Sequence, residues 1–273
     1  MIVITGAAGF IGSCLARSFN EIGVDDLLLV DDFSKSEKDS NLKGVKFNRC
    51  LDRTSYIQAP HAFPATAIFH IGARTDTTEF NKEVFDELNL NYSKAIWNFA
   101  TSQQIPLIYA SSAATYGDGK QGFDDKMDSI KDLAPLNPYG QSKQDFDLWA
   151  LSQKNHPPFW CGLKFFNVFG PNEYHKGRMA SVVYQTFNQI RETGQMKLFK
   201  SHHPDFADGE QSRDFVYIKD VINVIHFWFN HQKGSGIYNL GTGIARSFKD
   251  LATAVFKALD KKIDISYIPH LRI

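Results

Sequence analysis

Tyr139, Lys143 and Ser112 are the side chains of this sequence best suited to proton transfer on a small molecule. Tyr139 and Lys143 stand four residues apart in a helical pattern, so they share one helix face. A nearby ammonium lowers the pKa of a phenol and lets it exchange protons near neutral pH. Ser112 follows an expected strand, at the edge where an open α/β sheet binds ligands. Its hydroxyl could hydrogen-bond a substrate oxygen. Because the Tyr-Lys spacing is common in helices, this interpretation depends on the glycine loop upstream.

Three glycines join the first expected strand, residues 2–5, to the first expected helix, residues 10–22. Gly6 permits a tight turn, Gly9 lets the backbone approach a pyrophosphate, and Gly12 lets the helix pack close to the sheet. The helix then presents backbone N–H groups and the positive end of its dipole to the phosphates. The spacing is GxxGxxG. A strand before this loop and a helix after it predict a bound dinucleotide.

Asp31 ends the second expected strand, about 20 residues past the loop, where an acid meets the adenosine ribose. By itself this acid favours NAD. Lys35, Lys38 and Arg53 are nearby in the sequence and could neutralise the 2′-phosphate of NADP. The residues alone therefore leave NAD and NADP equally open.

Short apolar runs alternate with helical patterns in the first part of the chain. Runs typical of strands occupy residues 2–5, 27–30, 45–48, 67–70 and 107–110, and helical patterns occupy residues 10–22 and 89–102. Residues 117–138 predict a long loop, which after a strand is often functional. Alternation of this kind predicts a parallel sheet with helices on both faces. We therefore expect a Rossmann-like, doubly wound α/β fold.

The second half is less regular and predicts a smaller α/β region interleaved with the first. Strands are expected at residues 162–166, 215–218 and 237–240, and helices at residues 180–192 and 221–230. Ser247 and Asp250 predict a capping box that opens a last helix. We expect a dinucleotide-binding domain of residues 1–166, to which residues 213–242 return. Residues 167–212 and 243–273 then form a substrate-binding region.

Composition excludes several classes of protein. The 273 residues include 30 basic and 30 acidic side chains, so net charge gives no reason to expect nucleic acid or an anionic membrane as partner. Three cysteines without a CxxC spacing and histidines without an HxxxH spacing predict no disulfide framework and no metal site. No apolar run has the length of a membrane span, and the start MIVITGAAG is unlike a signal peptide. We expect a cytoplasmic protein.

The glycine loop, Ser112 and the Tyr-Lys pair together resemble the extended short-chain dehydrogenase/reductase family, which acts mostly on nucleotide sugars. Further segments are similar to one branch of that family, the ADP-heptose 6-epimerases, and the similarity covers essentially the whole chain. These segments are residues 67–79, 109–117, 165–171, 175–181 and 213–217. The most specific is His175-Lys-Gly-Arg-Met-Ala-Ser181, because the glycine loop and the Tyr-Lys pair are shared by all relatives.

The resemblance implies a bacterial enzyme of lipopolysaccharide inner-core precursor synthesis. Such an enzyme inverts carbon 6 of the heptose in ADP-D-glycero-D-manno-heptose. It implies NADP as the cofactor, with NAD as the alternative, and a homopentamer. It also implies relatives that continue several tens of residues past Ile273, so we expect the substrate-binding region to be shortened here.

The same resemblance implies roles for individual residues. The cofactor is expected along Phe10, Ile11, Asp31, Asp32, Lys38, Arg53, Ile71, Gly72, Ala73, Arg74, Thr75, Asn89, Tyr139 and Lys143. Besides Ser112, the substrate is expected along Asn167, Val168, Arg178, Gln185, Phe199, Lys200, Ser201, His202 and Arg213. Lys176 is implied as a second proton-transfer group. Arg178 and Gln185 depart from the residues usual in this branch, Ser and His.

Two other functions fit parts of the pattern. A nucleotide-sugar 4-epimerase needs only the tyrosine and remains open. Resemblance to dehydratases would place an Asp-Glu pair just after Ser112, but Ala113 and Ala114 stand there and cannot move protons. A non-catalytic dinucleotide sensor is the other alternative, although such sensors typically lose the tyrosine or lysine that this chain keeps.

Overall fold

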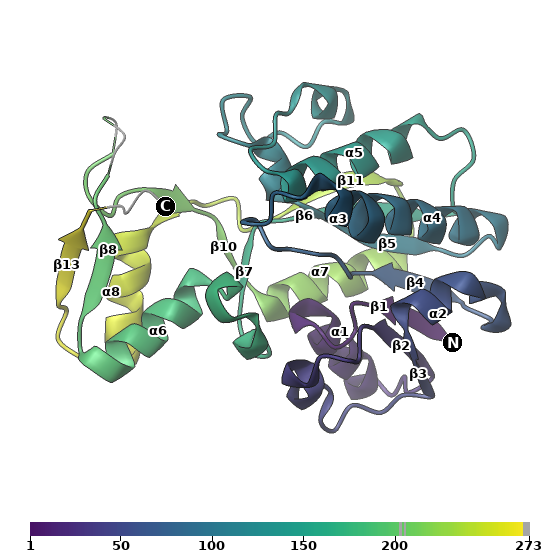
Figure 1. Cartoon of the computed structure of the whole chain (residues 1–273), viewed down its shortest axis with the longest axis horizontal. Helices are drawn as coiled ribbons and strands as arrows, with labels where there is room; N and C mark the ends of the chain where they lie inside the picture. The colour runs from purple at the N-terminus through teal and green to yellow at the C-terminus, as the bar shows by residue number, and fades with distance from the viewer. Residues whose placement is uncertain (202–203, 205, 270–273) are drawn as a thin grey trace. The chain divides into compact units, whose positions relative to one another are not determined.

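The computed structural model describes residues 1–201, 204 and 206–269. The chain forms two compact units and passes between them more than once (Figure 1). The first unit comprises Met1–Phe165 and Ile218–Leu240, and the second comprises Phe166–Tyr217 and Gly241–Ile273.

The first unit is built on a seven-stranded parallel sheet with the order β11-β6-β5-β4-β1-β2-β3. Its strands are β1 (Ile2–Thr5), β2 (Leu27–Asp31), β3 (Arg49–Asp52), β4 (Ala67–His70), β5 (Leu107–Ser112), β6 (Trp160–Phe165) and β11 (Gly236–Leu240). The chain runs outward from β1 to β3 and then returns to the other side of β1 as β4. This reversal creates the crevice at the carboxyl ends of β1 and β4 where doubly wound sheets bind ligands. The predicted Rossmann-like fold is confirmed.

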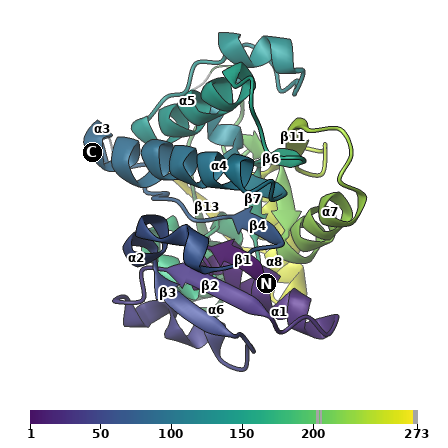
Figure 2. The same cartoon turned by 90° about the vertical axis from the view of Figure 1, so that its right-hand side faces the viewer.

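Helices cover both faces of this sheet (Figure 2). On one face α1 (Phe10–Glu21) lies beside α7 (Ile218–His231). Phe19 and Phe229 join these two helices with ring centroids 5.8 Å apart. The other face carries α2 (Arg53–Gln58), α4 (Tyr92–Ser102) and α5 (Pro138–Ser152), with the short α3 (Lys82–Phe85) preceding α4. Short 3-10 turns occupy part of the loop that was expected between β5 and α5.

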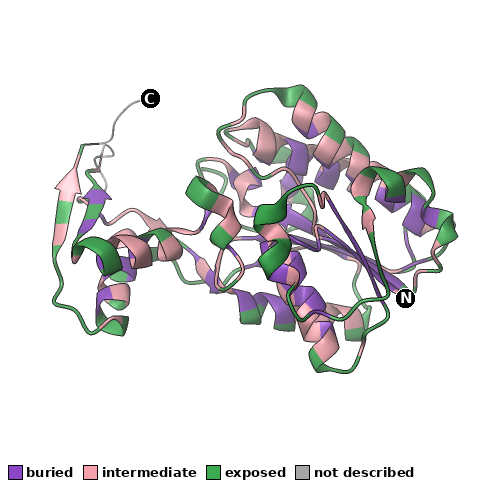
Figure 3. Cartoon of the chain, turned by 60° about the horizontal axis from the view of Figure 1, so that its bottom comes forward, coloured by how far each residue is buried: buried purple, intermediate pink, exposed green. Residues whose placement is uncertain are grey.

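The strands of this sheet form the core. All residues of β1, β2, β4, β5 and β6 are buried, and they appear purple in Figure 3. Burial on both faces explains why these strands read as continuous apolar runs in the sequence. Trp97 packs against Phe146 and Trp160, and Phe146 packs against Tyr109, in a hydrophobic cluster between the sheet and α4 and α5.

Two expected elements were placed wrongly. The strand expected at residues 45–48 lies at Arg49–Asp52, because β3 is an edge strand paired with β2 alone and is mostly exposed. An exposed edge strand needs no apolar run. The helix expected from residue 89 starts three residues later as α4, and a π-helical turn, Asp86–Asn91, precedes it.

Within its described residues, the second unit contains three two-stranded sheets and two longer helices. The parallel pairs are β7 (Asn167–Phe169) with β10 (Phe215–Tyr217) and β8 (Met196–Phe199) with β13 (Ile265–Ile268), and the antiparallel pair is β9 (Ser212–Arg213) with β12 (Arg246–Ser247). Ile190 of α6 (Val182–Thr193) and Phe256 of α8 (Phe248–Ala258) meet in its core. Ser247 and Asp250 form the predicted capping box. Residues 213–217 belong to this unit because β10 pairs with β7.

Candidate active site

The glycine loop between β1 and α1 brings backbone close to backbone. Gly6 has φ +68°, and a Cβ there would lie 2.5 Å from the Cα of Gly72 in the segment after β4. A Cβ at Gly12 would overlap the carbonyl oxygen of Gly6. Gly9 is the N-cap of α1 and no side chain caps the helix there. The loop therefore offers a backbone cradle at a helix N-terminus, which suits a pyrophosphate.

We expect Gly12→Ala to destabilise the loop, because the added methyl group meets backbone that cannot rotate away. Overpacking of this kind costs about 1–3 kcal/mol. Thermal and denaturant unfolding of the variant should show this loss. Gly23→Ala is not a suitable control because Gly23 has positive φ, but Ala16→Gly in the same helix separates general weakening of α1 from the clash. A Gly12→Ala protein as stable as the parent would contradict the close approach.

Carboxylates and basic groups meet at the carboxyl end of β2. The Asp31 carboxylate accepts hydrogen bonds from the backbone of Ala8 (2.8 Å) and Asp32 (2.7 Å) and from the Lys38 ammonium (2.6 Å). The Arg53 guanidinium lies 3.8 Å from the Asp32 carboxylate. A hydrogen bond from Ser34 holds the pKa of Asp32 below its usual value, although partial burial opposes this. Two acids and two bases thus surround the place where the adenosine end of a dinucleotide would lie.

Asn89 joins the segment after β4 to helix α5. Its amide exchanges hydrogen bonds with the backbone of Arg74, at 2.7 Å from the Arg74 N–H and 3.0 Å to the Arg74 carbonyl. Its amide nitrogen also donates to the hydroxyl of Ser142, at 3.0 Å. The segment of Ile71, Gly72, Ala73, Arg74 and Thr75 is therefore fixed beside the helix that carries Tyr139. The π-helical turn that ends at Asn91 carries this amide.

Ser112, Tyr139 and Lys143 come together where β5 ends and α5 begins. Asn137 caps α5 through a hydrogen bond from Gly140, and Pro138 takes the first helical position. Burial raises the pKa of Tyr139, and the neighbouring Ser112 side chain, at the last position of β5, opposes this rise. The Lys143 ammonium donates to the carbonyl of Ala110 at 2.7 Å. Burial lowers the pKa of Lys143 to about 8, and the Asp147 charge opposes this shift.

This arrangement can move a proton to or from a substrate oxygen. The Ser112 hydroxyl lies beside the Tyr139 phenol, and a buried ammonium that keeps its proton near neutral pH lies one helical turn away. The sequence predicted the pair of Tyr139 and Lys143 from its spacing, and Ser112 from its place at the end of a strand. It did not predict that Lys143 would be anchored on the Ala110 carbonyl of β5.

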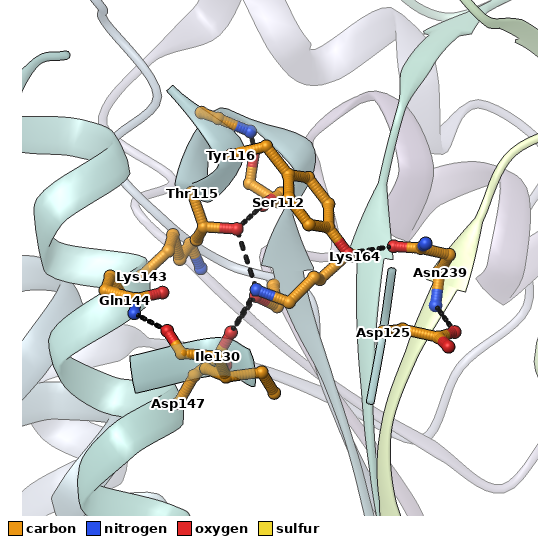
Figure 4. Close-up of polar contacts among 12 residues, drawn as sticks. Ser112, Thr115, Tyr116, Asp125, Ile130, Lys143, Gln144, Asp147, Lys164 and Asn239 are labelled. Carbon is orange, nitrogen blue, oxygen red and sulfur yellow. Dashed lines mark hydrogen bonds and ion pairs between the residues drawn. The ribbon is translucent and has the colours of Figure 1, made fainter. Parts of the chain in front are cut away.

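Sequence reasoning missed a buried polar cluster behind these side chains (Figure 4). Asp147 and Lys164 form an ion pair with both side chains fully buried. Asp147 stands four residues after Lys143 on α5, a spacing that could have drawn attention to it. Lys164 gave no such signal, because a lysine within a strand is ordinarily exposed. His70 at the end of β4 was also missed as a buried group, and burial lowers its pKa to about 3, so it is neutral.

The second unit holds the other residues that sequence analysis assigned to a substrate. Asn167 and Val168 lie on β7, Arg213 on β9, Gln185 on α6, Phe199 at the end of β8, with Lys200 and Ser201 directly after it. His202 lies outside the described residues. Arg178 is exposed in the 3-10 turn Tyr174–Met179, and the Gln185 amide donates to the carbonyl of Gly177 at 2.7 Å. These contacts place Gln185 against the turn that carries Arg178 and Lys176.

Glu173 fixes the turn that carries Lys176. This buried carboxylate accepts hydrogen bonds from the backbone of Gly170 (3.0 Å) and from the hydroxyl and backbone N–H of Ser181 (2.9 Å for the hydroxyl). It therefore holds together both ends of the segment. Burial lowers the pKa of Lys176, and the charge of Glu173 opposes this effect. A lysine in such surroundings can give and take a proton more readily than an exposed one.

Across residues 1–201, 204 and 206–269, no three His, Cys, Asp or Glu side chains gather as they would around a metal ion. Within the same residues, no helix combines the length and apolar character needed to cross a bilayer.

Comparison with known proteins agrees with this architecture. The sequence model of the NAD dependent epimerase/dehydratase family matches residues 2–241. The chain is 47% identical over 264 residues to the ADP-L-glycero-D-manno-heptose-6-epimerase of Fusobacterium nucleatum, a match that covers 94% of this chain and 80% of that one. The crystal structure of Helicobacter pylori ADP-L-glycero-D-manno-heptose-6-epimerase superposes with a TM-score of 0.86 at 33% identity, covering 98% of this chain and 84% of the other.

A more distant structure shares the fold as well. Thermus thermophilus UDP-glucose 4-epimerase in complex with NAD is similar with a TM-score of 0.76 at 25% identity, over 98% of this chain and 86% of that one. The chain belongs to the NAD dependent epimerase/dehydratase family. Within that family its similarity at 40–47% identity is to ADP-L-glycero-D-manno-heptose-6-epimerases.

Proposed function

We propose that this chain converts ADP-D-glycero-D-manno-heptose to ADP-L-glycero-D-manno-heptose by inverting carbon 6 of the heptose through oxidation and re-reduction. The observation that carries the proposal is the 47% identity to a protein named for this activity, over 94% of the chain. The cluster of Ser112, Tyr139 and Lys143 supplies the proton-transfer groups that such a reaction needs. The protein is therefore an isomerase.

A nicotinamide dinucleotide fits the residues of the first unit. A Cβ added at Gly6 or Gly12 would collide with the backbone of Gly72 or of Gly6, so glycine is what allows this tight loop, and no side chain caps the N-terminus of α1 beside it. Asp31 stands at the end of β2, where a ribose would be met. When bound, the cofactor supplies an acceptor for the hydride of carbon 6 and a donor for its return. The chain's own residues supply orientation and proton transfer.

Tyr139 takes the proton of the carbon 6 hydroxyl in this proposal and returns it in the reverse direction. Ser112 holds the same oxygen in this proposal, since its side chain is the polar neighbour that acts on Tyr139. The charge of Lys143 stabilises the phenolate, because an opposite charge nearby favours the ionised form. These three roles require no movement of the backbone between β5 and α5.

We further propose that the cofactor is NADP. Lys38 and Arg53 support this choice, because both place positive charge beside Asp31 and Asp32 at the end of β2. Without those charges the two carboxylates would repel a 2′-phosphate. The resemblance described above also favours NADP, and NAD is the alternative.

Arg53→Ala should weaken NADP binding and leave NAD binding nearly unchanged. Loss of one charge-assisted phosphate contact costs about 1.5–3 kcal/mol, which is roughly a 10- to 100-fold loss of affinity. Calorimetry on cofactor-stripped protein would measure both dinucleotides. Arg49→Ala on the neighbouring β3 is the matched control, since it removes the same charge four residues away. An equal loss for NADP and NAD would contradict the assignment of the 2′-phosphate to Arg53.

We also propose which residues contact the substrate, where the protein acts and how it assembles. The residues of the second unit, from Asn167 to Arg213, contact the sugar nucleotide. The protein acts in the cytoplasm in the synthesis of lipopolysaccharide inner-core precursors, and it assembles as a homopentamer. These three statements are supported by the family resemblance of the sequence.

Product analysis by NMR with ADP-D-glycero-D-manno-heptose tests the proposed function directly. We expect a new set of heptose signals for the carbon 6 epimer, with all other centres retained. The alternative of 4-epimerisation would change the signals at carbon 4, and a non-catalytic sensor would leave the sugar unchanged. UDP-glucose serves as the control substrate, and its conversion in place of ADP-heptose would favour the 4-epimerase.

A further inference from the structure

A fully buried ion pair lies directly behind the proposed catalytic side chains, and the reaction as described does not use it (Figure 4). The Lys164 ammonium of β6 is 3.1 Å from the Asp147 carboxylate of α5, and neither side chain is exposed. Burying two charges costs free energy that their attraction offsets only in part. Stability alone therefore does not explain why this pair of charges is buried next to Lys143.

The Asp147 carboxylate is held on the strand that ends at Ser112. The Tyr109 phenol donates to one of its oxygens at 3.0 Å, and the Ser111 hydroxyl donates to the other at 2.6 Å. Tyr109 and Ser111 flank Ala110, whose carbonyl accepts the hydrogen bond from Lys143. The Asp147 carboxylate and the Lys143 ammonium therefore reach the same three residues of β5.

Lys164 holds the other side of this carboxylate and reaches toward Ser112. Its ammonium donates a second hydrogen bond to the Thr115 hydroxyl at 2.7 Å and lies 5.2 Å from the ring centre of Tyr116. The Thr115 hydroxyl in turn donates to the Ser112 carbonyl at 2.9 Å. The carboxylate thus has three donors, from β5 and β6, and its position relative to Lys143 is fixed.

We propose that Asp147 is a positioning residue whose buried negative charge keeps the Lys143 ammonium protonated beside Tyr139. This rests on the proposed function, in which Tyr139 and Lys143 act on the substrate. Lys164, Tyr109 and Ser111 orient the carboxylate and do not touch the substrate themselves.

The charges around Lys143 support this role. Asp147 on α5 is the charged group that acts on Lys143, and Lys143 itself acts on His70 at the end of β4. Burial, assisted by the charge of Lys143, keeps His70 neutral, and burial together with Asp147 raises the pKa of Tyr109 well above its usual value. Of these groups, Asp147 is the carboxylate, and it is the partner of Lys164 in the buried ion pair. Burial lowers the pKa of Lys143 to about 8, and the charge of Asp147 acts in the opposite direction and raises it.

Asp147→Asn is the first test, because it removes the charge and nearly preserves the shape. The parent enzyme should lose its rate of epimerisation above about pH 8, as Lys143 loses its proton. In the variant this alkaline loss should move down by about one to three pH units, the usual effect of one opposite charge. Asp147→Glu should restore part of the parental profile.

Lys164→Met is the matched control. It breaks the same buried pair but leaves the Asp147 carboxylate with Tyr109 and Ser111 as donors. Its alkaline loss should therefore not move to lower pH. Equal downward movement in both variants, or an equal loss of rate at every pH without movement, would show that the pair is only structural and overturn the proposal.

A double variant, Asp147→Asn with Lys164→Met, covers the case in which the single Asn variant does not fold. It leaves no unpaired lysine, and neutral replacement of a buried pair is often well tolerated. Its alkaline loss should lie at lower pH than that of Lys164→Met alone, and equal profiles for these two variants would overturn the proposal.

A measurement that needs no turnover separates this inference from the proposed function. Tyrosine labelled with carbon-13 at the phenol carbon reports ionisation of Tyr139 by NMR in the holoenzyme, and Tyr139→Phe assigns its signal. In Asp147→Asn the phenol should ionise at higher pH, because Lys143 no longer carries a charge beside it. A parent protein that does not epimerise ADP-heptose would reject the proposed function, whereas an unchanged Tyr139 titration would reject the role of Asp147.

Discussion

Tyr139→Phe should lower the rate of epimerisation by roughly 10²- to 10⁴-fold, the usual loss when one positioned acid or base is removed. The variant lacks only the phenolic hydroxyl, which is the group on which Ser112 acts. Since the glycine loop and Asn89 are untouched, cofactor affinity should fall far less than the rate, even though Tyr139 is itself expected along the cofactor. The rate would be followed by NMR at carbon 6, with bound cofactor measured on the same sample.

A second Tyr-to-Phe change controls for loss of a hydroxyl in the same unit. Tyr238 lies on β11, and its phenol donates to the Gly234 carbonyl at 2.6 Å. Tyr238→Phe should turn over at the parental rate. A Tyr139→Phe protein that keeps more than a tenth of the parental rate would require another group to move the proton of the carbon 6 hydroxyl.

The parts of this molecule that local sequence determines were predicted from sequence. The glycine loop, the capping box of Ser247 and Asp250, and the Tyr-Lys spacing each depend on residues within about ten positions of one another. The buried strands of the first unit were recognisable because burial on both faces demands continuous apolar residues. The fold class followed from their alternation with helices.

The errors come from elements whose place is set by distant partners. β3 carries Arg49 and Asp52, so nothing in its own sequence marks it as a strand, and only pairing with β2 makes it one. β10 belongs to the second unit because it pairs with β7 in a parallel two-stranded sheet. Composition and periodicity do not report such pairing.

The same limit explains the buried pair of Asp147 and Lys164. Each residue alone is typical of a surface, and the ion pair exists because β6 lies next to β5 beneath α5. Asn89 is a similar case, since its contacts with Arg74 and Ser142 join a turn to a helix 53 residues away. Side-chain contacts that depend on which strands are neighbours in the sheet cannot be predicted before the fold is known.

Lys176→Met is expected to have an effect as large as that of Tyr139→Phe. Inversion requires hydride to leave one face of carbon 6 and return to the opposite face. Because the cofactor stays fixed, the ketone formed between the two events must turn about its carbon 5–carbon 6 bond. Its carbonyl oxygen therefore occupies a different position before and after the turn. Proton transfer needs hydrogen-bond contact, and one group does not easily reach both positions. We therefore propose Lys176 as the second group. Burial lowers its pKa, and Glu173 fixes its segment.

The rate of epimerisation in Lys176→Met should fall by roughly 10²- to 10⁴-fold, with cofactor content unchanged. The two epimers allow a sharper measurement, because each group should serve the oxidation of one of them. Mixed with the D and L epimers in turn, Lys176→Met should reduce the nicotinamide with one epimer only, and Tyr139→Phe with the other. Lys262→Met removes an exposed lysine of the same unit and should behave as the parent. If Lys176→Met epimerised at the parental rate, the second group would have to be sought elsewhere, while the role of Tyr139 would stand.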